Sequence, residues 1–346
     1  MKVVLNKRAQ KILHAVIQNY IKTAEPVGSR TVAKNYDLDL SPATIRNVMA
    51  ELDEMGLLTQ PHKSAGRVPT ELGLRYYVDT ILEINPISDQ EMRTIEEKFS
   101  TSGLDTAQLI KNVSKALSLV SHHIGLVLAP RFAYLQLKRL EFIRLSRKLV
   151  LTILVSQTGA VQNRIIELEE DISQEELNRF NRYLNDILEG LTIGEIKNLI
   201  LKEMQKEKIR FDEMLSKAFQ LGRQVFIQET LDDDLFIVGQ GNIFDYPEFS
   251  DVETLKIIFD ALEEKKLLIK LLDKAMSSSG VQIFIGSENK LTDIGGWTVI
   301  TSAYSRNSIP IGSLGILGPT RLNYSRIIPI VDYTAKMLGR TLEAIT

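Results

Sequence analysis

Three side chains between residues 44 and 47 have the chemistry to bind the edges of nucleic-acid bases. They are Thr44, Arg46 and Asn47. A guanidinium can donate two parallel hydrogen bonds to guanine, a carboxamide can pair with adenine, and a hydroxyl can contact either base. The segment from Leu40 to Ala50 contains no acidic residue that would repel phosphates. This pattern favours the readout of base edges in a duplex.

A helix has to position these side chains. Ser41 is suited to the N-cap, Pro42 to the first helical position, and Gly56 to the left-handed residue that ends a helix. Apolar residues recur between them at helical spacing on one face, namely Ile45, Val48, Met49, Leu52 and Met55. The candidate base-reading residues lie on the other face, as in a recognition helix. An ordinary amphipathic surface helix would show the same periodicity.

The segment after this helix supplies candidate phosphate contacts. Residues 57–59 predict a short strand, and residues 61–67 form a turn-rich, basic segment without an acid. A helix, a tight turn, a strand and a basic loop follow one another in this order in a winged helix. We therefore expect Lys63 and Arg67 to contact the DNA backbone or a groove beside the helix.

Two further helices are predicted upstream. Residues 6–21 keep helical spacing with Asn6 as the cap, and residues 29–36 predict a short helix. We expect Ser29, Arg30 and Ser41 to contact the DNA backbone, because helix starts attract phosphate. The alternative is that Ser29 and Arg30 only cap and solvate their helix.

A helix after the wing is predicted to join this head to the rest of the chain. It starts near Thr70 and includes Arg75, Tyr76 and Tyr77. These three residues could stack on bases, but aromatic residues at helical spacing more often pack against a neighbour.

Length and composition predict a globular protein of two or three domains, with 346 residues of which 44% are hydrophobic. The chain has no cysteine, which excludes disulfides, thiolate catalysis and cysteine-ligated metal centres. The N-terminal residues lack the apolar core of a signal peptide, and no apolar run is long enough to span a bilayer. We expect a cytoplasmic protein without a membrane partner.

Charge is distributed unevenly. The net charge is −2, but residues 1–75 carry eleven Lys and Arg against seven Asp and Glu, which leaves −6 for the remainder. A modestly basic head on an acidic body suits a nucleic-acid contact confined to the head. Residues 171–234 carry a net charge of −5 and are better suited to protein contact than to DNA contact.

The body alternates between strand and helix patterns. Helices are predicted at 88–99, 105–121, 252–262, 264–276 and 324–344, and strands at 124–128, 135–145, 149–156, 161–167, 281–286, 297–304 and 309–317. The four strands from 124 to 167 are expected to form one antiparallel meander. Residues 173–230 are predicted to be helical, with a wide apolar stripe that includes Phe211, Met214, Leu215 and Phe219. An α/β domain interrupted by a helical block is the simplest interpretation.

The sequence gives little support for a catalytic site or a metal-binding site. The four histidines are His14, His62, His122 and His123, and none lies in a nucleophile or metal motif. The glycine-rich segment at 312–319 lacks the lysine of a phosphate-binding loop, and the three aspartates at 232–234 lack the spacing of a calcium site. We expect no enzyme, no cofactor and no metal ion.

The sequence resembles the heat-inducible transcription repressor family, HrcA, over nearly its whole length. The head motifs are Pro-Val-Gly-Ser-Arg at 26–30, Ser-Pro-Ala-Thr-Ile-Arg-Asn at 41–47, Met-Ala-Glu-Leu at 49–52, Gly-Leu-Leu at 56–58, Ser-Ala-Gly-Arg-Val-Pro-Thr at 64–70 and Arg-Tyr-Tyr-Val-Asp at 75–79. The body motifs are Pro-Glu-Phe at 247–249, Ile-Gly-Ser-Glu-Asn at 285–289, Gly-Ile-Leu-Gly-Pro-Thr-Arg at 315–321 and Asn-Tyr-Ser-Arg-Ile-Ile at 323–328. Lys63 and the Gly-Gly-Trp at 295–297 depart from the family pattern.

The resemblance implies an α+β multidomain fold. It implies a winged helix-turn-helix domain at 1–72, a helical linker at 73–104, a GAF-like α/β domain with an antiparallel sheet at 105–170 and 278–346, and an inserted, mainly helical dimerisation domain at 171–277. The apolar stripe with Phe211, Met214, Leu215 and Phe219 is then expected to take part in dimerisation.

The resemblance also implies a function. A homodimer would bind an inverted-repeat operator of heat-shock (chaperone) operons, heat would inactivate it, and a GroE-type chaperonin would maintain the active form. The alternative is a small-molecule-gated regulator of another operon, because GAF-like domains often hold a ligand. A chaperone-interacting scaffold without DNA function is a further alternative.

Overall fold

The computed structural model describes residues 4–63, 65–100, 106–130, 136–157, 161–168, 170–204, 213–226, 235–249, 251–263, 265–289 and 296–344. The chain divides into two compact units. The first comprises Met1–Leu128, Leu235–Tyr304 and Ser313–Thr341, and the second comprises Ala129–Asp234, Ser305–Gly312 and Leu342–Thr346.

The head of the first unit has the predicted order of a winged helix. Its elements are α1 (Lys7–Thr23), α2 (Ser29–Asn35), α3 (Pro42–Glu54), β1 (Leu58–Thr59) and β2 (Val68–Pro69), followed by α4 (Glu71–Tyr76) and a π-helical turn (Tyr77–Ile81). Asn6 caps α1 by accepting a hydrogen bond from the Ala9 N–H. β1 and β2 pair antiparallel. The apolar faces of the three helices meet in a core that includes Ile12, Leu13, Val32, Ile45 and Leu52.

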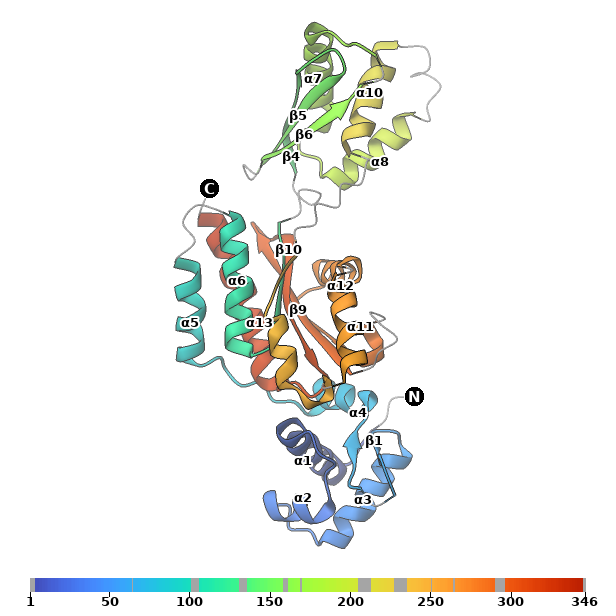
Figure 1. Ribbon diagram of the computed structural model, residues 1–346, viewed down its shortest axis with the longest axis vertical. Coiled ribbons are helices and arrows are strands. Elements are labelled where there is room, and N and C mark those ends of the chain that lie inside the picture. The colour runs from blue at the N-terminus through green and yellow to red at the C-terminus, as the bar shows by residue number, and fades with distance from the viewer. Residues whose placement is uncertain are drawn as a thin grey trace. The chain divides into compact units, whose positions relative to one another are not determined.

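The body of the first unit is a five-stranded sheet in the order β7-β3-β10-β9-β8. Its strands are β3 (Ile124–Leu128), β7 (Leu235–Val238), β8 (Val281–Ile285), β9 (Trp297–Arg306) and β10 (Ile309–Pro319), and its helices are α5 (Asp89–Ser100), α6 (Thr106–Ser121), α11 (Val252–Glu263), α12 (Lys266–Met276) and α13 (Tyr324–Ala344). β3 pairs antiparallel with both β10 and β7. Helices α6 and α13 lie on one side of this sheet, and α11 and α12 lie on the other (Figure 1).

The alternation along β3 explains this three-layer arrangement. Ile124, Leu126 and Leu128 belong to a core with residues of α11 and α12. Gly125 points the other way, and a Cβ added there would overlap the Ser114 carbonyl oxygen of α6. Glycine therefore lets α6 lie directly against the strand.

In its described residues, the second unit combines three strands with three helices. The sheet order is β4-β5-β6, formed by β4 (Leu137–Arg144), β5 (Leu149–Ser156) and β6 (Val161–Glu167), and all neighbours are antiparallel. The helices are α7 (Gln174–Leu188), α8 (Ile193–Met204) and α10 (Glu213–Phe226). Ser173 and Glu176 form the predicted capping box at the start of α7. One face of the sheet and the inner faces of the helices share an apolar core.

The structure corrects the predicted domain boundaries. The strands at 137–167, expected in the GAF-like domain, form the sheet of the second unit, and α11 and α12, expected in the insertion, pack on the five-stranded sheet. The insertion therefore begins near 129 and ends near 234 rather than spanning 171–277. The meander prediction was wrong because β3 pairs with strands from beyond the insertion and not with β4. Periodicity identifies a strand but does not name its partner.

Amide side chains of α7 cover the outer edge of β4. Asn185 accepts from the Leu140 N–H at 2.7 Å and donates to the Leu140 carbonyl at 2.8 Å. Asn181 does the same for Phe142, at 2.8 and 3.3 Å, and Gln174 accepts from the Arg144 N–H at 2.7 Å. An edge strand with satisfied backbone groups cannot recruit another strand.

We expect Asn185→Ala to destabilise the second unit by about 1–3 kcal/mol, because the Leu140 N–H and carbonyl lose their partners. Urea unfolding monitored by circular dichroism measures this change. Asn178→Ala is the matched control, since Asn178 is exposed on the same helix and accepts a hydrogen bond from Gln174. Equal midpoints for the two variants would show that the amides do not support β4.

Candidate nucleic-acid interface

The start of α3 is built as its sequence predicts. The Ser41 Oγ accepts from the Thr44 N–H at 3.1 Å and lies 2.9 Å from the Thr44 Oγ1, and Pro42 occupies the first turn. Gly56 ends the helix segment with φ +73°. Ile45, Val48, Met49 and Leu52 are buried in the head. The face opposite these residues is free to contact a ligand.

The three predicted base-reading residues lie in the first turns of this helix. Arg46 and Asn47 are exposed, and Thr44 is half-buried beside the Ser41 cap. The first turn has no acidic residue. Among the described residues, the side chains of Arg46 and Asn47 have no hydrogen-bond or ion-pair partner, so both can reorient toward a base edge. This end of the helix also carries the positive end of its dipole, which attracts phosphate.

The wing beside α3 contains one exposed cation and one that is already paired. Lys63 is exposed, and the Gln60 side chain shapes the loop around it by donating to the Lys63 and Ala65 carbonyls at 2.9 and 3.0 Å. Arg67 is already paired within the head. Its Nε lies 2.8 Å from the Asp53 Oδ2 of α3, and 20% of its side chain is exposed. Arg67 therefore attaches the wing to α3, and its contact with DNA stays a prediction.

The remaining predicted backbone contacts surround the same region. Arg30 is exposed in the first turn of α2, and Ser29 is half-buried there. Gly28 is the N-cap of α2 and provides no side-chain hydrogen bond. The Ser41 hydroxyl is used in capping α3. The structure places these three residues in the head with Arg46 and Asn47, and their contact with phosphate remains a prediction.

The aromatic residues after the wing pack rather than stack on bases. Tyr77 is buried, and its hydroxyl accepts from the Gln18 side chain at 2.7 Å. The Tyr76 hydroxyl accepts from the Leu5 N–H at 3.3 Å. Arg75 reaches the body and pairs with Glu288. This contact was not predicted, because the partners are separated by more than two hundred residues and each is an ordinary charged residue in its own segment.

The four predicted dimerisation residues do not form a described surface. Phe211 lies outside the described residues, and Met214 and Leu215 lie at the start of α10, where only the backbone is described. Phe219 is 1% exposed and contacts Tyr183 edge-to-face inside the core of the second unit. Its side chain supports this domain from within and does not present a surface to a second chain.

Other kinds of site are sparse in the described part of the chain. No group of three or more His, Asp or Glu residues there is arranged to hold a metal ion. No described helix combines the length and the apolar character needed to cross a bilayer.

His123 is buried beneath Tyr246, whose hydroxyl lies 2.6 Å from its Nδ1. Burial, followed by the nearby His122 and arginines, lowers the pKa of His123 to about 3, so it is neutral at physiological pH.

Comparison with known proteins identifies the family. Residues 4–76 match the model described as "Winged helix-turn-helix transcription repressor, HrcA DNA-binding", and residues 107–328 match "HrcA protein C terminal domain". The chain is 46% identical over 342 residues to the heat-inducible transcription repressor HrcA of Geobacter sulfurreducens, covering 98% of both chains. The chain belongs to the HrcA family. The HrcA of Syntrophobacter fumaroxidans is 45% identical over 340 residues, again covering 98% of both chains.

A solved structure supports the fold. A crystal structure described only as a hypothetical protein at 2.2 Å resolution superimposes with a TM-score of 0.63 at 23% identity, and the match covers 99% of this chain and all of the other. As an HrcA-family protein, the chain is a transcription repressor whose head is its DNA-binding domain. The predicted family and the multidomain fold with an N-terminal winged helix are thus confirmed.

We expect Arg46→Ala and Lys63→Ala to affect DNA binding in different ways. Loss of a base-edge contact at Arg46 should cost about 1–3 kcal/mol of specific binding and relax the choice of sequence. Loss of the exposed Lys63 charge should weaken all sequences alike and reduce the salt slope by about one unit. Fluorescence anisotropy with specific and scrambled duplexes at several salt concentrations measures both effects. Equal proportional losses of specific and nonspecific binding in the two variants would contradict this assignment.

Proposed function

We propose that this HrcA-family protein represses heat-shock (chaperone) operons by binding an inverted-repeat operator as a homodimer in the cytoplasm. Heat inactivates the dimer, and a GroE-type chaperonin maintains the active form. One observation carries the DNA-binding part of this proposal. In a domain of a DNA-binding family, the acid-free first turns of α3 present Arg46 and Asn47 to solvent without intramolecular partners among the described residues.

The roles of individual residues follow from their positions. Thr44, Arg46 and Asn47 read base edges from α3. Ser29, Arg30, Ser41 and Lys63 contact the backbone around it, while Arg67 holds the wing in place through Asp53. The relatives are named heat-inducible transcription repressors, which supports the assignment to heat-shock control.

An exposed apolar sheet face supports the homodimer. The side of the β4-β5-β6 sheet that faces away from the helices carries seven apolar residues, Ile143, Leu149, Leu151, Ile153, Val155, Val161 and Ile165. Register places Arg139, Glu141, Asn163 and Glu167 between and beside them on the same face. Register places Ile143, Leu151 and Ile165 in one row across the sheet, and Val155 beside Val161 in another. Val161 and Ile165 are 62% and 63% exposed. Soluble monomers rarely expose adjacent apolar residues on this scale, whereas an isologous interface between two copies would bury them.

The same face supports heat control by a chaperonin. Heating that separates or unfolds the dimer would expose apolar strands and remove the pairing of two heads on one operator. Exposed apolar segments aggregate unless they are captured, and capture followed by refolding would restore the repressor. Heat-damaged clients that occupy the chaperonin would leave the repressor inactive, and transcription would rise.

The ligand-gated alternative has weaker support. A cavity whose lining includes His123, Tyr246, Phe249 and Trp297 has a volume of about 10 Å³, which is room for about one water molecule. Pockets for small molecules are larger, at roughly 300–1,000 Å³. The family comparisons do not favour this alternative either.

Selection of bound duplexes from a random pool tests the operator proposal. We expect enrichment of an inverted repeat by the full-length chain, because two heads related by a twofold axis read the same half-site in opposite directions. Arg46→Ala should enrich a relaxed consensus, and Arg93→Ala on the exposed surface of α5 is the control. Recovery of unrelated sequences, or of a single half-site without its repeat, would contradict a dimeric repressor.

Substitution of Ile165 tests the dimer surface. We expect Ile165→Lys to weaken self-association more than about tenfold, because it would bury an unpaired charge in each copy. Sedimentation velocity across a dilution series measures this change. Leu201→Lys is the matched control, since Leu201 is an exposed apolar residue of the same unit but lies on α8. Dissociation of the Leu201 variant alone would place the interface on the helical side.

A further inference from the structure

Helix α4 is attached to the end of the recognition helix by backbone contacts. The Thr70 hydroxyl donates to the Gly56 carbonyl at 2.6 Å, and the Thr70 N–H donates to the Leu57 carbonyl at 3.1 Å. A Cβ added at Gly73 would overlap the Leu57 carbonyl oxygen. The two backbones are therefore in direct contact, and α3 cannot rotate without moving α4.

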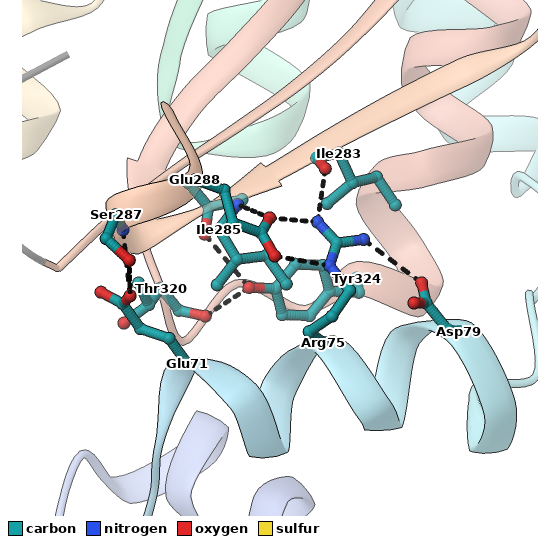
Figure 2. Close-up of polar contacts among 10 residues, drawn as sticks. Glu71, Arg75, Asp79, Ile283, Ile285, Ser287, Glu288, Thr320 and Tyr324 are labelled. Atoms are coloured by element: carbon teal, nitrogen blue, oxygen red, sulfur yellow. Dashed lines mark hydrogen bonds and ion pairs between the residues drawn. The ribbon is translucent and has the colours of Figure 1, made fainter. Parts of the chain in front are cut away.

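The opposite side of α4 is attached to the body. The Glu71 carboxylate accepts from the Ser287 N–H at 3.0 Å and from its hydroxyl at 2.7 Å. Arg75 forms a forked ion pair with Glu288, with its Nε 2.9 Å from the Glu288 Oε1, and its Nη2 also donates to the Ile283 carbonyl at 2.6 Å. Figure 2 shows Glu71 and Arg75 reaching from α4 toward the end of β8 and the turn after it.

Both ends of this contact are held in place locally. Asp79 accepts from the Arg75 Nη1 at 3.2 Å, and Glu288 accepts from the Ile285 N–H at 2.9 Å. Burial acts to raise the pKa of the Glu288 carboxyl, but hydrogen bonds from Arg75 and the Ile285 N–H together outweigh burial and lower the pKa. Glu288 is therefore ionised at neutral pH, and its fork geometry with Arg75 restricts direction as well as distance.

Gly286, in the turn after β8, lies against the Glu71 carboxylate. It has φ +54°, and a Cβ at this position would overlap the Glu71 carboxylate. A residue with a side chain would therefore push Glu71 away from Ser287. Glycine in the turn after β8 thus leaves room for the Glu71 carboxylate beside Ser287.

Two further contacts join the head segment to the body at different elements. Arg321 pairs with Glu248 and donates to the Ile21 carbonyl in the last turn of α1 at 3.2 Å. The Asn85 N–H, after the π-helical turn, donates to the Ser325 carbonyl at 3.2 Å. Attachment at several separate points restricts rotation as well as separation.

We propose that Glu71, Arg75, Ser287 and Glu288, here called the α4 clamp, are positioning residues that set the orientation of the recognition helix on the body. The clamp thereby determines the half-site spacing that a dimer accepts. This inference rests on the proposed dimeric operator binding. A half-site contact depends on α3 alone, whereas simultaneous contact with two half-sites depends on the angle at which each body holds its head.

Operator spacing provides the test. Full-length wild type, Arg75→Gln and Glu288→Gln are titrated with the selected palindrome, with palindromes lengthened by about five base pairs, or half a helical turn, and with a single half-site. The two variants change the net charge in opposite directions, so a shared effect cannot be an effect of overall charge. Arg93→Gln, exposed on α5, is the control for arginine loss.

We expect wild type and Arg93→Gln to bind the natural spacing more than about tenfold tighter than the lengthened palindrome. Both clamp variants should reduce this preference to below about threefold, while single half-site affinity changes less than about threefold. A clamp variant that keeps the wild-type spacing profile would overturn the clamp. A wild type without any preference for a palindrome would instead overturn the proposed function.

A second measurement needs no DNA. The chain has no cysteine, so Lys34→Cys on α2 and Lys256→Cys on α11, both exposed, accept two spin labels. Pulsed dipolar spectroscopy on labelled chains diluted into unlabelled protein measures the head-to-body distance within one chain. We expect a narrow distribution in wild type and a broad one in Arg75→Gln and Glu71→Ala. Narrow distributions in both variants would overturn the clamp even if operator binding were never found.

Discussion

The backbone contact between α4 and the end of α3 is the constraint on which the head depends. The Thr70 N–H donates to the Leu57 carbonyl, and Gly73 allows α4 to touch Leu57 without an intervening side chain. A contact between two backbones cannot relax through a change of rotamer, as a contact between long side chains can. The recognition helix, the wing strand β2 and the first turn of α4 consequently form one rigid piece. A displacement of α4 therefore moves α3 with it.

Apolar and polar contacts have different roles in the first unit. Each part has its own apolar core, one below the face of α3 that includes Ile45 and Leu52, the other around the five-stranded sheet. The contacts between head and body that involve Glu71, Arg75 and Arg321 are polar. Apolar burial has no preferred direction, whereas a forked ion pair fixes an angle. The head can thus fold on its own core while polar contacts determine how the body presents it.

Sequence patterns predicted the features that depend on neighbouring residues. Caps at Asn6, Ser41 and Ser173 and the strands of the head and body follow from local chemistry. Local patterns do not show which distant residue or strand an element will contact. The same basic residue in the wing fits a phosphate or the carboxylate of Asp53, and only the fold shows that Arg67 takes the carboxylate. For the same reason β3 was assigned to the wrong sheet, and the pairing of Arg75 with Glu288 was missed.

The amide-covered edge of β4 narrows the ways in which two copies can associate. Asn181 and Asn185 satisfy the backbone groups through which another strand would add to β4, so extension of the sheet at that edge is blocked. The outer face with Val161 and Ile165 has no such protection. In the proposed homodimer this face would meet its own copy across a twofold axis, which would close the assembly at two chains. Such a pair would present two heads in opposite directions, and an inverted repeat has that symmetry.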